Sequence, residues 1–276
     1  MASELLDLLE SIDGRMLRIL ELVVALDFAE AGEGCAGPGM AAGSALQVRK
    51  LDLFTPGGQF LAQQVSFDLV KGVPLLVTGP NGSGKSLLFL TLLGLVPPAG
   101  AEACITVDSM PLATRPGLAL VMASPQRVYL PLGTLGNQVT YPRAHVAGEE
   151  AELREVLRAV GLQHILEREP RGWEALRIWE DVLSGGEQQR MGLARVFYTR
   201  PRFALLDECT SMVASDAEEG LYKAIFAKGV TPLTLSQRLF MPALYKLELS
   251  LGAPNPEGWS LTSTRCEPAY DGCGQG

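Results

Sequence analysis

Apolar residues recur at helical spacing through the first part of the chain, with charged side chains between them. The apolar positions are Leu5, Leu8, Leu9, Ile12, Met16, Ile19, Leu20 and Val23. Because residues three or four apart share one face of a helix, this pattern predicts an amphipathic helix within residues 1–28, interrupted near Asp13 and Gly14. Residues 29–43 are rich in Gly and Ala and predict a flexible linker, so we expect a domain to begin at residue 44.

The pattern then changes to short alternating runs. Residues 46–70 alternate around the turn Pro56-Gly57-Gly58 and predict an antiparallel sheet. Further on, apolar runs predict strands over 74–78 and 203–207, a core helix over 87–93 and an amphipathic helix over 150–166. We expect the folded domain to end near residue 252, because the Gly/Pro-rich segment 253–276 predicts a disordered tail.

The segment GPNGSGKS at residues 79–86 fits the phosphate-binding pattern G-x-x-x-x-G-K-[ST], and it lies where a predicted strand passes into a predicted helix. Its glycines let backbone N–H groups point at an anion beside the positive end of that helix. Lys85 would then reach the β and γ phosphates, and Ser86 would offer its hydroxyl to Mg²⁺. A glycine-rich turn before a core helix is the alternative, although such a turn does not need Lys and Ser in register. The nucleotide-binding residues expected here are Gly79, Pro80, Asn81, Gly82, Ser83, Gly84, Lys85, Ser86 and Leu87.

The segment LSGGEQQR at residues 183–190 opens another helix. Ser184 is placed as an N-cap, with Glu187 three residues later as in a capping box, and the helix start offers free backbone donors. Since the chain has one P-loop, this second anion site suggests that Ser184, Gly185, Gly186 and Glu187 hold the ATP of a partner chain. An ordinary capped helix is the alternative, and it does not exclude that role.

The segment FALLDECTS at residues 203–211 ends a buried strand in two adjacent carboxylates. In P-loop enzymes an Asp at this place supports Mg²⁺, and the next acid can orient and deprotonate the attacking water. We therefore expect Asp207 to hold the metal and Glu208 to be the catalytic base. The alternative is an acidic pair that solvates the edge of the sheet.

The order of P-loop, Gln126, LSGGEQQR and LLDE resembles the ATP-binding cassette (ABC) transporter family across residues 45–251. Within it, residues 124–142 and 186–211 look most like subfamily D, the peroxisomal half-transporters, and their SbmA/BacA-type bacterial relatives. The resemblance implies an α/β fold: a P-loop NTPase (RecA-like) core, an antiparallel β subdomain and a helical insert over about 127–182. It also implies that Gln126 touches Mg²⁺ and the water, and that Phe54 stacks on adenine. A surface Gln and a core Phe are the alternatives.

Two positions depart from the family pattern. Gln237 stands where the family usually has a His. Gln can donate a hydrogen bond to a γ-phosphate oxygen, but it cannot take up a proton, so we expect slow turnover with Glu208 still acting as base. The second departure is the loop after Glu208, where Ser-Met-Val-Ala at 211–214 replaces the usual Ser-Ala-Leu-Asp, although subfamily D often lacks that Asp too.

Composition excludes several classes of function. The chain has 276 residues and a net charge of -8, which argues against a protein that neutralises nucleic-acid phosphates, so we expect no nucleic-acid partner. Its five cysteines lack CxxC spacing, which favours a reducing compartment over a disulfide scaffold. Acidic residues interrupt the apolar N-terminus, so we expect no secretory signal, and no apolar run is long enough to predict a membrane span.

The function implied by the resemblance is the ATP-binding and ATP-hydrolysing motor domain of an ABC half-transporter, with ATP and Mg²⁺ as cofactors. Two such domains, as a homodimer or heterodimer, would close head to tail around ATP and drive an ABC membrane domain, with residues 1–28 as the connector. The expected location is the cytosolic face of a membrane, the peroxisomal membrane in a eukaryote. The alternative is an ATP-switched regulatory domain with little turnover because of Gln237, and an ABC ATPase of repair or translation is less favoured.

Overall fold

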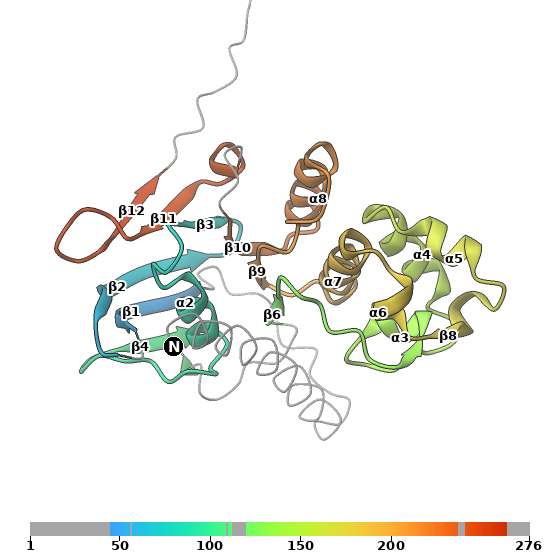
Figure 1. The fold of residues 1–276 in the computed structure, drawn as a ribbon, viewed down its shortest axis with the longest axis horizontal. Coiled ribbons are helices and arrows are strands. Elements are labelled where there is room, and N and C mark those ends of the chain that lie inside the picture. Colours follow the sequence, from blue (N-terminus) through green and yellow to red (C-terminus); the bar gives the residue numbers. More distant parts are fainter. Residues whose placement is uncertain (1–44, 56, 109, 112–119, 237–240, 264–276) are drawn as a thin grey trace, which may run out of the picture.

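The computed structural model describes residues 45–55, 57–108, 110–111, 120–236 and 241–263. The predicted connector, the predicted linker and Gln237 lie outside these residues. Figure 1 shows the described chain as an antiparallel sheet at one end, a larger sheet with helices in the middle and a group of short helices at the other end. This arrangement confirms the predicted α/β fold with a β subdomain and a helical insert.

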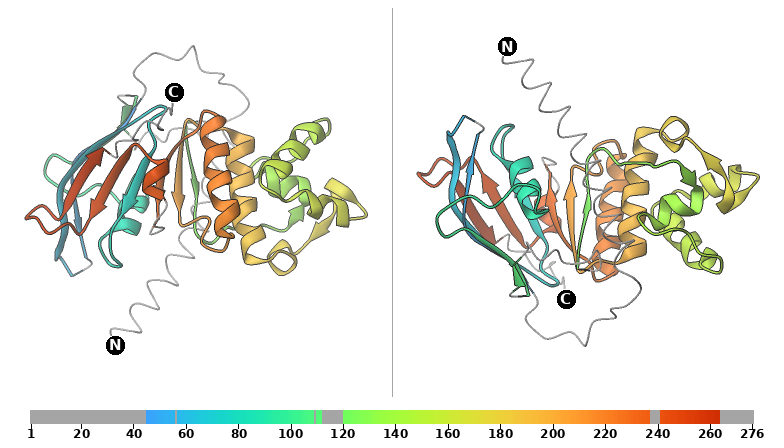
Figure 2. Two further views of the ribbon diagram at one scale, coloured as in Figure 1. Left: turned by 90° about the horizontal axis from the view of Figure 1, so that it is seen from above. Right: turned by 90° about the horizontal axis from the view of Figure 1, so that it is seen from below.

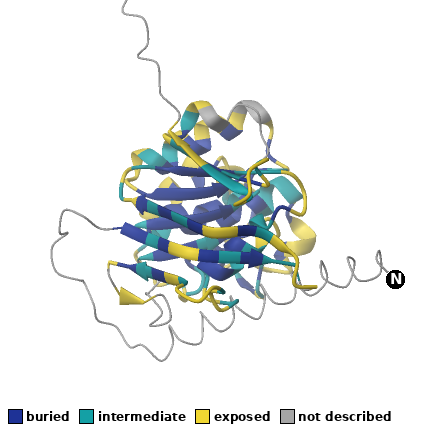
Figure 3. Cartoon of the chain, turned by 90° about the vertical axis from the view of Figure 1, so that its left-hand side faces the viewer, coloured by how far each residue is buried: buried dark blue, intermediate teal, exposed yellow. Residues whose placement is uncertain are grey.

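The antiparallel sheet has the strand order β2-β1-β4-β5. Its strands are β1 (Ala45–Phe54), β2 (Phe60–Val70), β4 (Cys104–Val107) and β5 (Met110–Pro111). Strands β1 and β2 pair from Ala45 opposite Val70 to Phe54 opposite Phe60, as the alternation over 46–70 predicts. Buried and exposed residues alternate along these strands in Figure 3, because successive side chains point to opposite faces.

The larger sheet has the order β12-β11-β3-β10-β9-β6. Five of its strands are parallel: β3 (Leu75–Thr78), β6 (Val121–Ser124), β9 (Phe203–Asp207), β10 (Thr231–Leu235) and β11 (Leu247–Leu251). The short helix η3 (Met241–Leu244) precedes β11. The centre of this sheet is therefore parallel, as is typical of strands that are buried on both faces.

The predicted disordered tail from residue 253 is wrong for its first part. Residues Trp259–Ser263 form β12, which is antiparallel to β11. Gly252 and Gly258 have φ of 77° and 73°, and these left-handed residues allow the chain to reverse between the two strands. The indole N–H of Trp259 donates to the carbonyl oxygen of Gln63 at 2.8 Å, which ties the edge strand to β2.

Both faces of the parallel sheet are covered. Helix α2 (Lys85–Leu92) lies between the two sheets, whereas α7 (Gly185–Thr199) and α8 (Ser215–Ala227) lie on the opposite face, as Figure 2 shows. Phe203 and Leu205 pack in the core around α2, and Ala204 and Leu206 pack in the core around α7. Strand β9 is therefore packed on both of its faces, so its C-terminal end is held in a fixed position.

The insert consists of short elements between β6 and α7. They are β7 (Gly133–Thr134), α3 (Leu135–Thr140), α4 (Glu150–Ala159), α5 (Gln163–Arg168), the 3₁₀ turn η2 (Gly172–Glu174), β8 (Leu176–Arg177) and α6 (Trp179–Val182). The single helix predicted over 150–166 is wrong, because Gly161 has φ of 68° and separates α4 from α5. Within the described ranges, no helix has the length and apolar character needed to cross a membrane.

Candidate nucleotide site

The P-loop, Gln126 and the Asp207-Glu208 pair meet at one edge of the parallel sheet. The P-loop follows β3, Gln126 follows β6 and Asp207 ends β9, while β10 between them ends two residues before Gln237. Because parallel strands end at the same edge, segments far apart in the sequence come together there. This edge is where such folds bind ligands.

The P-loop backbone needs glycine at its first position. Gly79 has φ of 141°, and a Cβ atom at this residue would lie 2.4 Å from the carbonyl oxygen of Leu251 and 2.7 Å from Ser83 Oγ. Gly84 caps α2 in a left-handed conformation with φ of 99°. The loop is therefore compressed against the end of β11 and turned so that it leads directly into the start of α2.

Lys85 lies across this loop. Its Nζ donates to the carbonyl oxygens of Gly79 and Pro80 at 2.7 and 2.9 Å. Burial lowers the pKa of Lys85, while the negative charges of Glu208 and Asp207 act in the opposite direction. The ammonium therefore lies in the field of both carboxylates, in a position to bind an anion delivered to the loop.

Glu208, the second acid of the pair, contacts Gln126, which follows the neighbouring strand β6. Gln126 Nε2 donates to Glu208 Oε2 at 3.3 Å, and the backbone N–H of Glu208 donates to the carbonyl oxygen of Leu235 at 3.1 Å. Glu208 has φ of 40°, which is rare for a residue with a Cβ atom and costs about 1–3 kcal/mol. Such strain is concentrated at functional sites, and here the hydrogen bonds with Gln126 and Leu235 hold the predicted base in this conformation.

The oxygen donors expected for Mg²⁺ are Ser86, Gln126 and Asp207. Among the described residues, no group of three or more His, Cys, Asp or Glu could hold a metal by itself. Mg²⁺ usually keeps several waters and binds through one or two carboxylates plus substrate phosphates. A hydroxyl, an amide and a carboxylate therefore fit a magnesium ion that arrives with a nucleotide.

The helix α7 begins with the capping box predicted from the sequence. Glu187 N–H donates to Ser184 Oγ at 3.3 Å, and Ser184 N–H donates to Glu187 Oε2 at 2.8 Å. Glu187 Oε1 also lies 2.7 Å from His164 Nε2 of α5. Burial raises the pKa of Glu187, but the hydrogen bonds from His164 and Ser184 outweigh it and lower that pKa to about 2. The helix start is thus anchored to the insert by an ionised side chain.

The two glycines of this segment are needed because there is no room for a Cβ atom at either position, which the sequence did not reveal. A Cβ atom on Gly185 would lie 2.2 Å from Met212 Sδ, and one on Gly186 would lie 2.7 Å from the carbonyl oxygen of Met212. The loop after Glu208 therefore packs directly on the start of α7. In the sequence, Met212 is only part of a departure from the family pattern.

Phe54 lies at the end of β1, half-buried, with its ring centroid 5.0 Å from that of Phe60. Leu53 and Leu61, the neighbours of this pair, both approach a Cβ position at Gly84 to 3.4 Å. The hairpin end is therefore beside the P-loop, where the predicted adenine platform should be. Phe60, which was not predicted, is 51% exposed and adds a second aromatic face.

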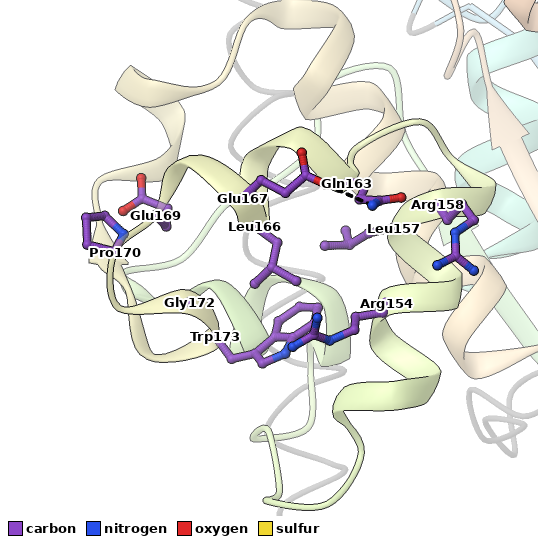
Figure 4. Close-up of a pocket in the computed structure, with 10 residues that line it drawn as sticks. All are labelled: Arg154, Leu157, Arg158, Gln163, Leu166, Glu167, Glu169, Pro170, Gly172 and Trp173. Atoms are coloured by element: carbon purple, nitrogen blue, oxygen red, sulfur yellow. Dashed lines mark hydrogen bonds between the residues drawn. The ribbon is translucent and has the colours of Figure 1, made fainter.

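A cavity of about 320 Å³ lies in the insert rather than at the sheet edge. Figure 4 shows its lining, with the Arg154 side chain running toward Trp173, and with Arg158 at the opposite end from Glu169 and Pro170. None of its lining residues belongs to the predicted site. The residues predicted to bind nucleotide lie instead on the loops at the edge of the parallel sheet.

Comparison with known proteins agrees with this geometry. The profile of the ABC transporter family matches residues 62–211. ABC transporter D family member 1 of Arabidopsis thaliana is 36% identical over 275 residues, covering 91% of this chain and 20% of that protein. ATP-binding cassette sub-family D member 3 of Mus musculus is 44% identical over 195 residues, covering 67% of this chain and 27% of that protein. The chain thus spans less than a third of the length of these relatives.

Among solved structures, the fold is similar to that of a bacterial Atm1-family ABC exporter with ATP bound. The TM-score is 0.66 at 23% sequence identity, and the match covers 80% of this chain and 39% of that chain. This likeness supports the arrangement of the two sheets and the helical insert.

Proposed function

Since this chain belongs to the ABC transporter family, we propose that it is the ATP-binding and ATP-hydrolysing motor domain of a half-transporter of the subfamily D type. One observation carries the proposal. Lys85 lies in the field of Asp207 and Glu208, and Gln126 donates to Glu208, so motifs far apart in the sequence share one site.

The residues have distinct roles in this proposal. Lys85 exchanges the loop carbonyls for the β and γ phosphate oxygens of ATP, and Ser86, Gln126 and Asp207 supply oxygen ligands to Mg²⁺, which neutralises charge on the phosphates. Glu208 orients and deprotonates the attacking water, and Gln126 holds the Glu208 carboxylate from the side. Phe54 provides the stacking face for adenine, and Gln237 donates to the γ-phosphate.

A second copy of the domain, identical or homologous, completes the site. Ser184 is exposed at the start of α7, a helix of 15 residues with its positive end toward solvent. We propose that Ser184, Gly185, Gly186 and Glu187 bind the ATP held by the facing P-loop, with the ionised Glu187 side chain directed to His164 rather than to the γ-phosphate. ATP then joins two domains head to tail, and hydrolysis separates them.

The membrane partner has a candidate contact surface. Leu132, Leu176 and Ile178 are 77%, 54% and 62% exposed, and the pairing of β7 with β8 brings them together. Exposed apolar clusters of this kind mark interaction sites. We propose that an ABC membrane domain contacts this surface, with residues 1–28 as the connector, at the cytosolic face of a membrane that is peroxisomal if the source is eukaryotic.

Steady-state phosphate release tests the catalytic assignment. We expect Glu208→Gln to lower turnover at least about a hundredfold while ATP binding remains, because general base catalysis contributes about that much. Glu219→Gln is the matched control, since Glu219 is an exposed carboxylate on α8 paired with Lys223 at 2.6 Å. Equal turnover in the natural chain and Glu208→Gln would contradict the proposal.

ATP-driven pairing tests the second half of the proposal. In the Glu208→Gln background, ATP should produce a dimer in analytical ultracentrifugation, and Ser184→Arg should prevent it without loss of ATP binding. A dimer that survives this change would remove Ser184 from the interface. No observation on the described residues favours a regulatory domain without turnover, the alternative based on Gln237.

A further inference from the structure

One buried side chain connects the start of α7 to the catalytic loops. Gln189 lies in the second turn of α7 and is 2% exposed. It is five residues after Ser184, a distance along the helix of about 7.5 Å at the usual rise per residue. A primary amide in such a position must be hydrogen-bonded to be tolerated.

The amide of Gln189 contacts both loops that carry catalytic residues. Its Nε2 lies within donating distance of the carbonyl oxygens of Gln126 and Glu208, at 3.2 and 3.4 Å, and of Ser211 Oγ at 2.8 Å. Its Oε1 accepts from the backbone N–H of Met212 at 2.8 Å. An amide nitrogen has two hydrogens, so the shortest contact, with Ser211, takes one and the two carbonyls share the other.

These contacts make a continuous path between two sites. Met212, which Gln189 holds by its N–H, is the residue packed on Gly185 and Gly186. At the other end, Glu208 is held in a left-handed conformation and so has little freedom to adapt to a shifted carbonyl. A movement of the α7 start would therefore be passed to the Glu208 loop through Gln189.

We propose that Gln189 is a positioning residue that couples the partner's ATP, bound at the start of α7, to the placement of Glu208 and Gln126 in the chain's own site. The inference rests on the proposed function, because it assumes that this helix start reads a second ATP. In this role Gln189 does not contact nucleotide. Its effect should appear in turnover and in cooperativity between sites rather than in ATP affinity.

Gln189→Met tests the coupling in the full chain. Met has a similar length and no hydrogen-bonding amide, so we expect kcat to fall roughly tenfold, as for the loss of a buried donor, with KM changed less than about twofold. The Hill coefficient for ATP should fall toward about 1. Gln188→Met is the matched control: Gln188 Nε2 donates to the carbonyl oxygens of Glu180 and Leu183, so the same change one residue away leaves the catalytic loops alone.

Ser211→Ala provides a second variant, which removes the 2.8 Å contact of Gln189 with Ser211 Oγ and keeps the buried amide. We expect a smaller loss of cooperativity than in Gln189→Met. If Gln189→Met does not fold, Ser211→Ala alone tests the coupling role of Gln189. Unchanged kcat and Hill coefficient in the folded variants, or a natural chain whose sites do not cooperate, would overturn the coupling role. Absence of ATP hydrolysis in the natural chain would instead overturn the proposed function, so the two failures are distinguishable.

Discussion

Replacing Glu187 by Gln should destabilise the protein in a pH-dependent way. Glu187 closes the capping box of α7 through Ser184 and reaches His164 of α5 at 2.7 Å. Gln keeps an oxygen that can accept from Ser184 N–H, but it removes the negative charge. The variant therefore isolates the electrostatic part of this contact between α7 and the insert.

The size of the effect follows from the pKa. A lowering from the ordinary value of 4.5 to about 2 is equivalent to at most about 3 kcal/mol. The side chain is 12% exposed, so water screens part of this, and we expect a loss of about 2 kcal/mol in the free energy of unfolding at pH 7. Because the folded pKa of Glu187 is lowered, its contribution is complete above pH 4.5 and is lost as pH falls through about 2.

Urea denaturation at several pH values measures this dependence. We expect the difference between the natural chain and Glu187→Gln to shrink by about half between pH 7 and pH 3. Glu152→Gln is the control, because Glu152 pairs with Arg200 at 2.7 Å on an exposed surface, where such pairs contribute about 0–1 kcal/mol. A difference below about 0.5 kcal/mol at pH 7, or one that stays constant to pH 3, would refute the reasoning.

Three further expectations concern the site and its surroundings. Gly79→Ala should abolish ATP binding in calorimetry and lower the unfolding free energy by roughly 2 kcal/mol or more, because its Cβ would meet a backbone oxygen of β11 at 2.4 Å; a variant that binds normally would contradict this. Thr210→Val should cost about 1–3 kcal/mol in urea denaturation, because Thr210 Oγ1 donates to the fully buried Glu218 at 2.5 Å, and an unchanged midpoint would count against that contact. Cys209 should resist iodoacetamide in the native protein while Cys104 reacts, because burial raises the pKa of Cys209 to about 12 and Cys104 is exposed. Peptide mass mapping measures this, and labelling of Cys209 in the native protein would be inconsistent with its burial.

Local chemistry in the sequence determined much of this protein. The P-loop, the capping box at Ser184 and the buried strand that ends in Asp207 each depend on residues within a few positions of one another. Backbone conformation, helix capping and side-chain alternation act over that range, so their patterns are visible without a fold. The family resemblance rests on the order of these local motifs.

Only the tertiary structure decided which distant groups meet. Three features join segments that are separated along the chain. They are the edge strand β12, the packing of Met212 on Gly185 and Gly186, and the hydrogen bonds of Gln189. The break at Gly161 between α4 and α5 was also hidden, because an amphipathic pattern continues across a glycine that turns the chain. Such contacts depend on strand order and on how helices pack, and a linear pattern of polar and apolar residues carries neither.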